Sequence, residues 1–154
     1  MKIDDKDRKI IKQLQINARQ SISQIAKKTG LPRDVVKYRI KKLEQTKLIY
    51  RYIAEINPKL LGYSLNAYVG FSLLNLEPEE ENAFIGFLKA NKNISYVAKT
   101  SGKWDILIGV YAKDYIELDN ILRSIRLKYS KIIKDFDMAP IIDYYKYSWT
   151  SDLI

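Results

Sequence analysis

Apolar side chains recur at helical spacing through the first part of the chain, between polar start and stop signals. A first helix is predicted to begin at Asp4, whose carboxylate can cap free backbone N–H groups. A second begins at Ser21, because Ser21 and Gln24 have the spacing of a capping box, and Gly30 ends it. The expected buried residues are Ile10, Ile11 and Leu14 in the first helix and Ile22, Ile25 and Ala26 in the second.

A third helix is predicted after a short turn, with Pro32 at its first position and its end near Thr46. Its expected buried stripe is Val36, Ile40 and Leu43, and its opposite face carries Arg33, Asp34, Lys37, Tyr38 and Lys41. A helix with an apolar back and a basic, partly aromatic front suits the major groove of DNA, which admits one helix. A basic helix face is also commonly just a solvated surface.

The pattern changes to strands and helices in the second half of the chain. We predict strands over 49–57, 63–73, 94–100 and 104–112 and a helix over 79–91. A further helix should open at Asp114 or Tyr115, and a closing strand should run from Lys131 to about Trp149, with an interruption at Pro140. The order after residue 63 is βαββαβ, the ferredoxin-like arrangement. The strand over 104–112 is apolar on both faces, which favours a central place in the sheet.

The predicted fold class is therefore α+β, with three parts. These are a three-helix helix-turn-helix domain of winged-helix-like type over 1–48, a linking strand and hinge over 49–62, and a ferredoxin-like domain over 63–154. Both helices of the last domain should cover one sheet face. The other face, with its apolar and Tyr side chains, should then meet another subunit, although the 12 Tyr residues also suit ordinary packing.

Charge is distributed unevenly between the two halves. Met1 to Leu60 holds 16 Lys and Arg against 6 Asp and Glu, whereas Leu61 to Ile154 holds 11 against 12. A positive potential confined to one module favours a polyanionic partner, with nucleic acid the first candidate and an anionic membrane the second.

Cysteine and histidine are both absent. Their absence removes disulfides, the usual zinc sites, the Ser-His-Asp triad and the commonest general base. We therefore expect no enzyme, no cofactor and no metal. The N-terminus lacks the apolar core of a signal peptide, and no run approaches the roughly 20 apolar residues of a membrane span. We expect a soluble, cytoplasmic protein.

Over some fifty residues the N-terminal half resembles the Lrp/AsnC (feast/famine) transcriptional regulators. The matching positions are Asp4, Asp7 to Ile10, Leu14, Gln15, Ala18, Arg19, Ile25, Ala26, Leu31, Val36, Arg39, Ile40, Leu43, Glu44 and Ile49. Two positions depart from the pattern: Pro32 replaces a capping Ser, which Asp34 should offset through the helix dipole, and Lys47 replaces a Gly. The resemblance implies a homodimer that can assemble as a tetramer of dimers (an octamer), with the linking strands of two subunits paired.

Roles on DNA follow as hypotheses. Arg33, Lys37, Tyr38 and Lys41 are candidates for base edges or flanking phosphates, and Val35 for a thymine methyl. Ser21, Lys27 and Lys28 are candidates for phosphate contacts. Arg39 is expected to serve helix packing instead, since its family position borders the helix interface.

Gly102, Lys103, Trp104 and Asp105 match the Gly-x-x-Asp motif of the family's ligand-sensing domain. By resemblance, backbone groups and Asp105 help to bind a free amino acid between dimers, and Lys103 and Trp104 would line the same cleft. A glycine-bearing hairpin turn followed by Asp is common, so Gly102 could equally serve the turn alone.

Two other functions compete with an effector-modulated, sequence-specific regulator. One is an architectural DNA-binding protein without an effector, which the ratio of specific to non-specific affinity would distinguish. The other is a haem-pathway decarboxylase, since some of these enzymes resemble the family in both domains. Such enzymes are expected to use histidine around a tetrapyrrole, and this chain has none.

Overall fold

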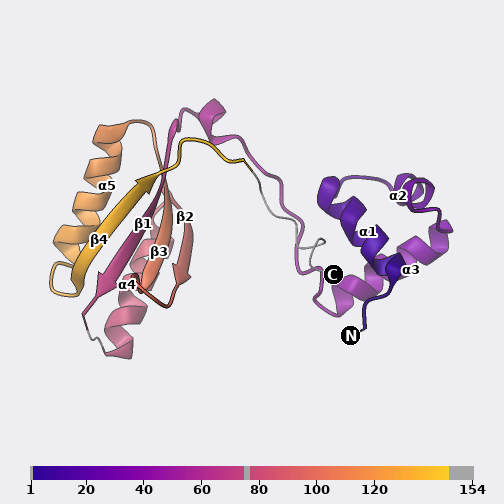
Figure 1. Ribbon diagram of the computed structural model, residues 1–154, viewed down its shortest axis with the longest axis horizontal. Helices are drawn as coiled ribbons and strands as arrows, with labels where there is room; N and C mark the ends of the chain where they lie inside the picture. The colour runs from indigo at the N-terminus through magenta and orange to yellow at the C-terminus, as the bar shows by residue number, and fades with distance from the viewer. Residues whose placement is uncertain (1, 75–76, 146–154) are drawn as a thin grey trace. The chain divides into compact units, whose positions relative to one another are not determined.

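A computed structural model describes residues 2–74 and 77–145 of the chain. It has two compact units, one built from residues 2–55 and the other from Ile56–Tyr144. Figure 1 shows that the first unit is helical and that helices pack with a sheet in the second.

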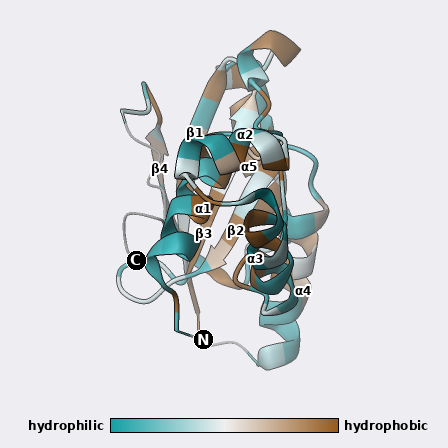
Figure 2. Ribbon diagram, turned by 90° about the vertical axis from the view of Figure 1, so that its right-hand side faces the viewer, coloured by the Kyte–Doolittle hydropathy of each residue, from teal (hydrophilic) through white to brown (hydrophobic). Residues whose placement is uncertain are grey.

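The three predicted N-terminal helices are all present: α1 (Asp5–Ile16), α2 (Ile22–Thr29) and α3 (Arg33–Gln45). Asp4 and Ser21 cap α1 and α2, each with a full capping box, and Gly30 ends α2 at φ 70°. Hydrophilic and hydrophobic stretches alternate along these helices in Figure 2, because each has one apolar face. Those faces form one core, made of Ile10, Ile11, Ile25, Ala26, Val36 and Leu43.

Pro32 lies one position earlier than predicted. It is the N-cap residue of α3 rather than its first residue, and no side chain caps this helix. The expected loss of a cap relative to Ser is thus confirmed. Asp34 lies in the first turn of α3, where a carboxylate interacts favourably with the positive end of the dipole.

The predicted strand over 49–57 is wrong for the single chain. Residues 51–57 have no regular secondary structure, and a short 3-10 turn, η1 (Pro58–Leu61), follows them. A strand requires a neighbour for its backbone hydrogen bonds, and no backbone N–H of residues 50–56 donates to a main-chain carbonyl within the described chain. The β-rich composition indicates an extended conformation but supplies no pairing partner.

The second unit has the predicted βαββαβ order. Its elements are β1 (Leu65–Leu73), α4 (Pro78–Ala90), β2 (Ile94–Lys99), β3 (Ile106–Ala112), α5 (Tyr115–Lys128) and β4 (Ile133–Pro140). The strands are antiparallel in the order β2-β3-β1-β4, which confirms the central place of β3. Asp114 caps α5 by accepting from the Glu117 N–H.

The closing strand is shorter than predicted. It ends at Pro140, where the sequence indicated an interruption, and residues 141–145 do not continue it. One further hydrogen bond, from the Ile141 N–H to the Asn66 carbonyl, extends the pairing beyond Pro140. The rest of the prediction, 146–149, lies outside the described residues.

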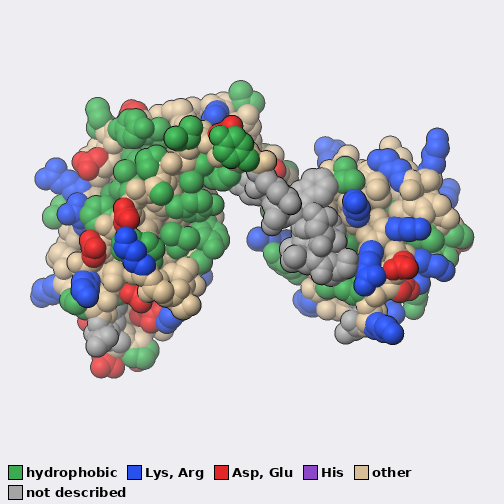
Figure 3. Space-filling view, in the orientation of Figure 1, with side chains coloured by type: hydrophobic (Ala, Val, Ile, Leu, Met, Phe, Trp, Pro, Cys, Tyr) green, Lys and Arg blue, Asp and Glu red, His purple; other side chains and the backbone are tan. Residues whose placement is uncertain are grey.

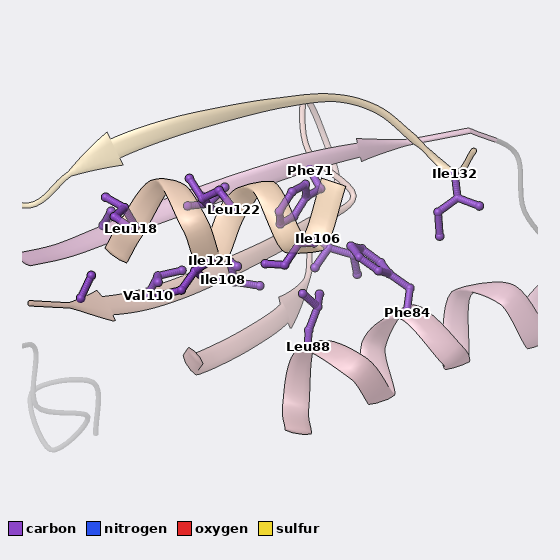
Figure 4. Packing of buried hydrophobic residues seen from close by; sticks show 14 residues of the cluster. Phe71, Phe84, Leu88, Ile106, Ile108, Val110, Leu118, Ile121, Leu122 and Ile132 are labelled. Carbon is purple, nitrogen blue, oxygen red and sulfur yellow. The ribbon is translucent and has the colours of Figure 1, made fainter. Parts of the chain in front are cut away.

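The core of this unit lies between the sheet and its two helices (Figure 4). Phe71 from β1 and Phe84 from α4 meet edge to face with ring centroids 5.7 Å apart, and both are fully buried. Such a pair contributes about 0.5–1.5 kcal/mol beyond the burial of its area. Side chains alternate along β1, so Asn66, Tyr68, Gly70 and Ser72 lie on the opposite face, which we call the outer face of the sheet.

Candidate DNA and effector sites

An ion-pair cluster fixes α3 against α1. The Arg39 guanidinium donates through Nη1 to Asp4 Oδ1 and to Asp7 Oδ1, each at 2.8 Å, and Asp7 is buried. The backbone N–H of Asp7 and the Arg39 guanidinium hold the pKa of Asp4 below its usual value. The same contacts, that with Asp7 first, raise the pKa of Arg39. The expected packing role of Arg39 is thereby confirmed.

The other cations of α3 face solvent. Arg33, Lys37 and Lys41 are exposed and follow one another at four-residue spacing, so they form one stripe along the helix. None of the three makes an ion pair with a carboxylate among the described residues. Tyr38 is 67% exposed beside this stripe, whereas Val35 is half-buried at its margin. The stripe is therefore available to a polyanion.

The candidate phosphate ligands lie on α2 of the same unit. The Ser21 hydroxyl accepts from the Gln24 N–H at 3.2 Å, which leaves its O–H able to donate. Lys27 and Lys28 are exposed in the last turn, and Lys28 Nζ donates to Gln20 Oε1 at 2.6 Å. Ser21 and the two lysines thus occupy opposite ends of α2, and only the lysines adjoin the turn into α3.

One further residue on α3 was missed by the sequence interpretation. Gln45 is exposed four residues after Lys41 and seven after Tyr38, so it continues the outward face to the end of the helix. Helical spacing alone predicts this position. The sequence interpretation considered charged and aromatic side chains and therefore omitted the neutral amide of Gln45.

The segment after α3 is held by a strained residue and a side-chain hydrogen bond. Lys47 adopts φ 60°, the left-handed conformation in which the sequence comparison led us to expect Gly. The Tyr52 hydroxyl donates to Glu44 Oε1 at 2.9 Å, and burial together with this carboxylate raises the pKa of Tyr52 to about 12.

The candidate effector loop joins β2 to β3 and is tied to β1. The Asp105 N–H donates to the Phe71 carbonyl at 2.9 Å, and Asp105 Oδ2 accepts from the Leu73 N–H at 2.7 Å. Gly102 lies at φ 127°, which an L side chain rarely adopts, so the turn itself requires glycine. One oxygen of Asp105 is thus structural, and its Oδ1 makes no hydrogen bond or ion pair within the described residues.

Trp104 lies in this loop rather than in β3, and its ring covers Gly70. A Cβ at Gly70 would stand 2.5 Å from the Trp104 Cγ, so only glycine fits beneath the ring. Lys103 Nζ lies 4.2 Å from the centroid of that ring and 3.2 Å from Asp137 Oδ2 on β4. The loop therefore lies against the outer face of the sheet, so the four motif residues adjoin that face.

The outer face carries exposed tyrosine side chains, as predicted, together with polar Asn66 and Ser72 of β1. Tyr68 and Tyr96 meet edge to face with centroids 6.5 Å apart and are 37% and 49% exposed. Gly109 lies beneath them, because a Cβ there would meet the Tyr96 Cβ at 3.2 Å. In Figure 3, hydrophobic side chains gather across the middle of the sheet unit.

Two kinds of site are not found in the described part of the chain. Residues 2–74 and 77–145 hold no group of three or more acidic side chains placed to bind a metal ion. No helix in the same residues is both long enough and apolar enough to cross a membrane.

Comparison with known proteins extends these observations. The family described as AsnC-type helix-turn-helix domain matches residues 3–44. The HTH-type transcriptional regulator FL11 of Pyrococcus abyssi is 32% identical over 120 residues, which cover 78% of each chain.

Solved structures share the whole fold. That of an AsnC family transcriptional regulator from Agrobacterium tumefaciens matches with a TM-score of 0.86 and 25% identity, covering 95% of this chain and 94% of the other. A transcriptional regulator from Neisseria meningitidis, solved as an L-Met complex, has a TM-score of 0.88 at 18% identity, covering 99% and 100%. These relatives are regulators, in line with the expectation that the chain is not an enzyme. The chain belongs to the AsnC/Lrp family of helix-turn-helix transcriptional regulators.

Proposed function

We propose that this regulator binds DNA sequence-specifically through α3 and that a small-molecule effector, an amino acid, modulates the binding. The proposal rests on a contrast between the cations of α3. Arg39 is engaged in ion pairs with Asp4 and Asp7. The stripe of Arg33, Lys37 and Lys41 is exposed to solvent. The ion pairs of Arg39 with Asp4 and Asp7 hold α3 rigidly against α1. A rigid basic helix presents its side chains to the major groove at fixed spacing.

Individual roles follow from the position of each side chain. Arg33, Lys37, Tyr38 and Lys41 would reach base edges or flanking phosphates, and half-buried Val35 would offer only its edge to a thymine methyl. Ser21, Lys27 and Lys28 would contact phosphates. Residues 1–48 would then form the DNA-binding domain, 49–62 the link, and 63–154 the sensing and oligomerisation domain.

The loop of Gly102, Lys103, Trp104 and Asp105 is the proposed effector site. Asp105 Oδ1 suits an ammonium group, and loop backbone N–H groups suit a carboxylate, which together describe a free amino acid. The complex of the Neisseria relative with L-Met supports this ligand class without fixing the ligand of this chain. The contact of Trp104 with Gly70 links the loop to the outer face.

The proposed working unit is a cytoplasmic homodimer, formed through the outer face and able to assemble further as a tetramer of dimers. The support is the exposed apolar surface around Tyr68 and Tyr96, since contiguous apolar patches of this kind mark subunit contacts. A two-fold dimer would place two copies of α3 in successive major grooves of a palindromic site.

Selection of bound fragments from random double-stranded DNA, with and without a panel of amino acids, tests the proposal. We expect an enriched palindromic sequence and at least one amino acid that changes its affinity. Retention of DNA without sequence enrichment would favour an architectural protein instead.

A pair of variants tests the effector site separately. Lys103 pairs with Asp137 beside the loop, whereas Lys99 pairs with Glu81 of α4. Lys103→Ala should weaken the response to the amino acid several-fold, and Lys99→Ala, which removes an equally exposed lysine and its ion pair, should not. Equal responses in the two variants would place the effector elsewhere.

A further inference from the structure

Helix α5 exposes large apolar side chains on the side away from the sheet. Ile116 and Leu127 are 75% and 68% exposed, whereas four other apolar residues of this helix are buried in the core. With exposed Asn120 and Arg123 they follow the spacing i, i+4, i+7 and i+11, so the four side chains form one stripe about 16 Å long. A single exposed leucine is common, so the surroundings of Leu127 decide whether this surface suits a partner.

Cationic groups lie on both sides of Leu127. Arg126 Cζ is 4.5 Å from the centroid of the Phe136 ring on β4, and Lys128 Nζ is 4.3 Å from that of the Phe87 ring on α4. These ring contacts hold the two neighbours of Leu127 along opposite borders of α5. The leucine is thus an apolar centre between positive charges, and an apolar centre with a charged rim is typical of a contact between proteins.

The charge around this centre is not neutralised within the described chain. Residues 120–134 hold five Lys and Arg and no Asp or Glu. None of the five cations forms an ion pair with a carboxylate of residues 2–74 and 77–145. Arg126 and Lys128 suit the negative end of the helix dipole, but Arg123 lies one turn earlier. The surface as a whole therefore favours an anionic partner.

The neighbouring helix α4 has the complementary chemistry. Its first turn is acidic, and Glu79 in that turn forms no ion pair with any described residue. Exposed Ala83, Gly86 and Ala90 continue from Glu79 at the spacing i+4, i+7 and i+11, and we call these three the small-residue stripe. A Cβ at Gly86 would have no neighbouring atom within 4 Å, so the stripe is open. Small side chains allow another helix to approach closely.

The two helices cover the same face of the sheet and form what we call the helix layer. The Tyr129 hydroxyl, at the end of α5, donates to the Ala83 carbonyl at 3.3 Å, and the Tyr129 ring lies 4.9 Å from that of Phe84. The strand pairings make α4 and α5 antiparallel. Leu127, two residues before Tyr129, is therefore level with Gly86, two residues after Phe84.

The helix layer is complementary to itself. A half-turn about an axis between the two helices and parallel to them sets α5 of each copy against α4 of the other, without a shift along either helix. Leu127 of one copy then meets the small-residue stripe at Gly86 of the other, and exposed Lys131 meets the acidic first turn at Glu79. Each contact occurs twice, because a two-fold interface is reciprocal.

We propose that a second copy of this chain packs on the helix layer, with Leu127 and Lys131 of each copy against the exposed face of α4 in the other. The helix layer and the outer face lie on opposite sides of the sheet, so each homodimer of the proposed function carries two helix layers and can bind further dimers. The contact thus names the surface for further assembly, and it rests on the proposed function for the dimer.

Two charge reversals in the full chain test the reciprocal contact. Lys131→Glu sets like charges against Glu79 of the second copy, and Glu79→Lys sets like charges against Lys131. Sedimentation should show assembly beyond the dimer at least tenfold weaker for each variant alone than for the natural chain. An equal mixture of the two variants should assemble as the natural chain does, because each reversed charge then meets the other.

Lys113→Glu is the matched control, since exposed Lys113 follows Ala112 at the opposite end of the sheet. It should assemble as the natural chain does. A mixture that stays dimeric, or single reversals that assemble as the control does, would overturn the proposed contact. A natural chain that binds DNA as a dimer and assembles no further would also overturn it, while the proposed dimer and its DNA binding would stand.

Leu127→Ser tests the apolar centre without a change of charge. It should weaken assembly beyond the dimer at least tenfold, because the leucine is the side chain that fills the small-residue stripe. Ile142→Ser, which removes an apolar side chain that is 94% exposed after β4, should leave assembly unchanged. Both positions are exposed, so urea denaturation should give both variants the stability of the natural chain. Equal assembly of the two variants would contradict a contact centred on Leu127.

Discussion

Residues of the same type perform opposite tasks on α3, according to the side of the helix on which they lie. Arg39 is directed at Asp4 and Asp7 and orients the helix, whereas Arg33, six residues earlier, is exposed. The charge total of the chain does not distinguish the two, but helical spacing does, because Arg39 borders the stripe of Val36 and Leu43. Position relative to the core therefore separates a structural cation from one available to DNA.

Lys47→Gly should stabilise the DNA-binding unit. A left-handed L residue costs about 1–2 kcal/mol, and the greater freedom of glycine in the unfolded chain offsets about 0.4–1 kcal/mol of that. We expect a net gain of about 0.5–1 kcal/mol in the free energy of unfolding, measured by urea denaturation.

The matched control is Lys42→Gly, which removes the same charge from the last helical turn of α3. It should destabilise by about 1 kcal/mol, since helical glycine costs that much relative to alanine. If Lys47→Gly also destabilises the protein, the left-handed conformation of Lys47 is not the source of strain.

At the scale of elements, local signals in the sequence predicted most of the fold. Caps at Asp4, Ser21 and Asp114 marked helix starts, and alternation along β1 separated the core face from the outer face. The prediction of a strand over 49–57 was wrong, because a strand needs a neighbouring strand to pair with and amino-acid composition does not identify one. The contact of Trp104 with Gly70 was equally unpredictable, since it joins positions on different strands and loops.

The ion-pair cluster of Arg39 with Asp4 and Asp7 predicts that the stability of the protein depends on pH. The folded-state pKa of Asp4 is lowered by the Asp7 N–H and by Arg39, so its contribution is present at neutral pH and is lost as the pH falls through that lowered pKa, below 3.8. Asp4→Asn keeps a capping side chain but removes the charge. Between pH 7 and 3, unfolding measurements should therefore show a smaller loss of stability for Asp4→Asn than for the natural chain.

Asp5→Asn is the control for this comparison, because the one ion pair that Asp5 makes within residues 2–74 and 77–145 is with exposed Arg8, three residues away. Its loss of stability on acidification should match that of the natural chain. If the natural chain loses no more stability between pH 7 and 3 than Asp4→Asn does, the role given to the ion-pair cluster is contradicted.

At the scale of the whole molecule, the two units present surfaces of different chemistry. The first unit presents cations, whereas the sheet unit presents the aromatic outer face beside the proposed effector loop. In the proposed function, an effector bound at this loop would alter subunit contacts without touching DNA, because the loop adjoins the outer face through Trp104. Such coupling requires that the effector bind one assembly state more tightly than the other.

Tyr96→Glu tests the outer face as a subunit contact. A carboxylate buried without a partner is costly, and each 1.4 kcal/mol lost weakens association tenfold. Sedimentation should show a dimer or larger assembly for the natural chain and at least tenfold weaker dimerisation for the variant.

The control is Asn82→Glu, which introduces the same charge at an exposed position of α4. It should leave the dimer intact. If the two variants sediment equally, the outer face is not part of the subunit interface.

The central claim is that the exposed stripe of α3 binds DNA, and a comparison of two double variants tests it most directly. Lys37→Ala with Lys41→Ala removes two stripe cations, while Lys89→Ala with Lys92→Ala removes two exposed cations from the sheet unit. Affinity for a selected fragment is measured by fluorescence anisotropy over a range of salt concentrations. The stripe variant should bind at least tenfold more weakly, with a salt slope reduced by about 2, and the control should bind as the natural chain does. Unchanged affinity in the stripe variant, or an equal loss in the control, would contradict the claim.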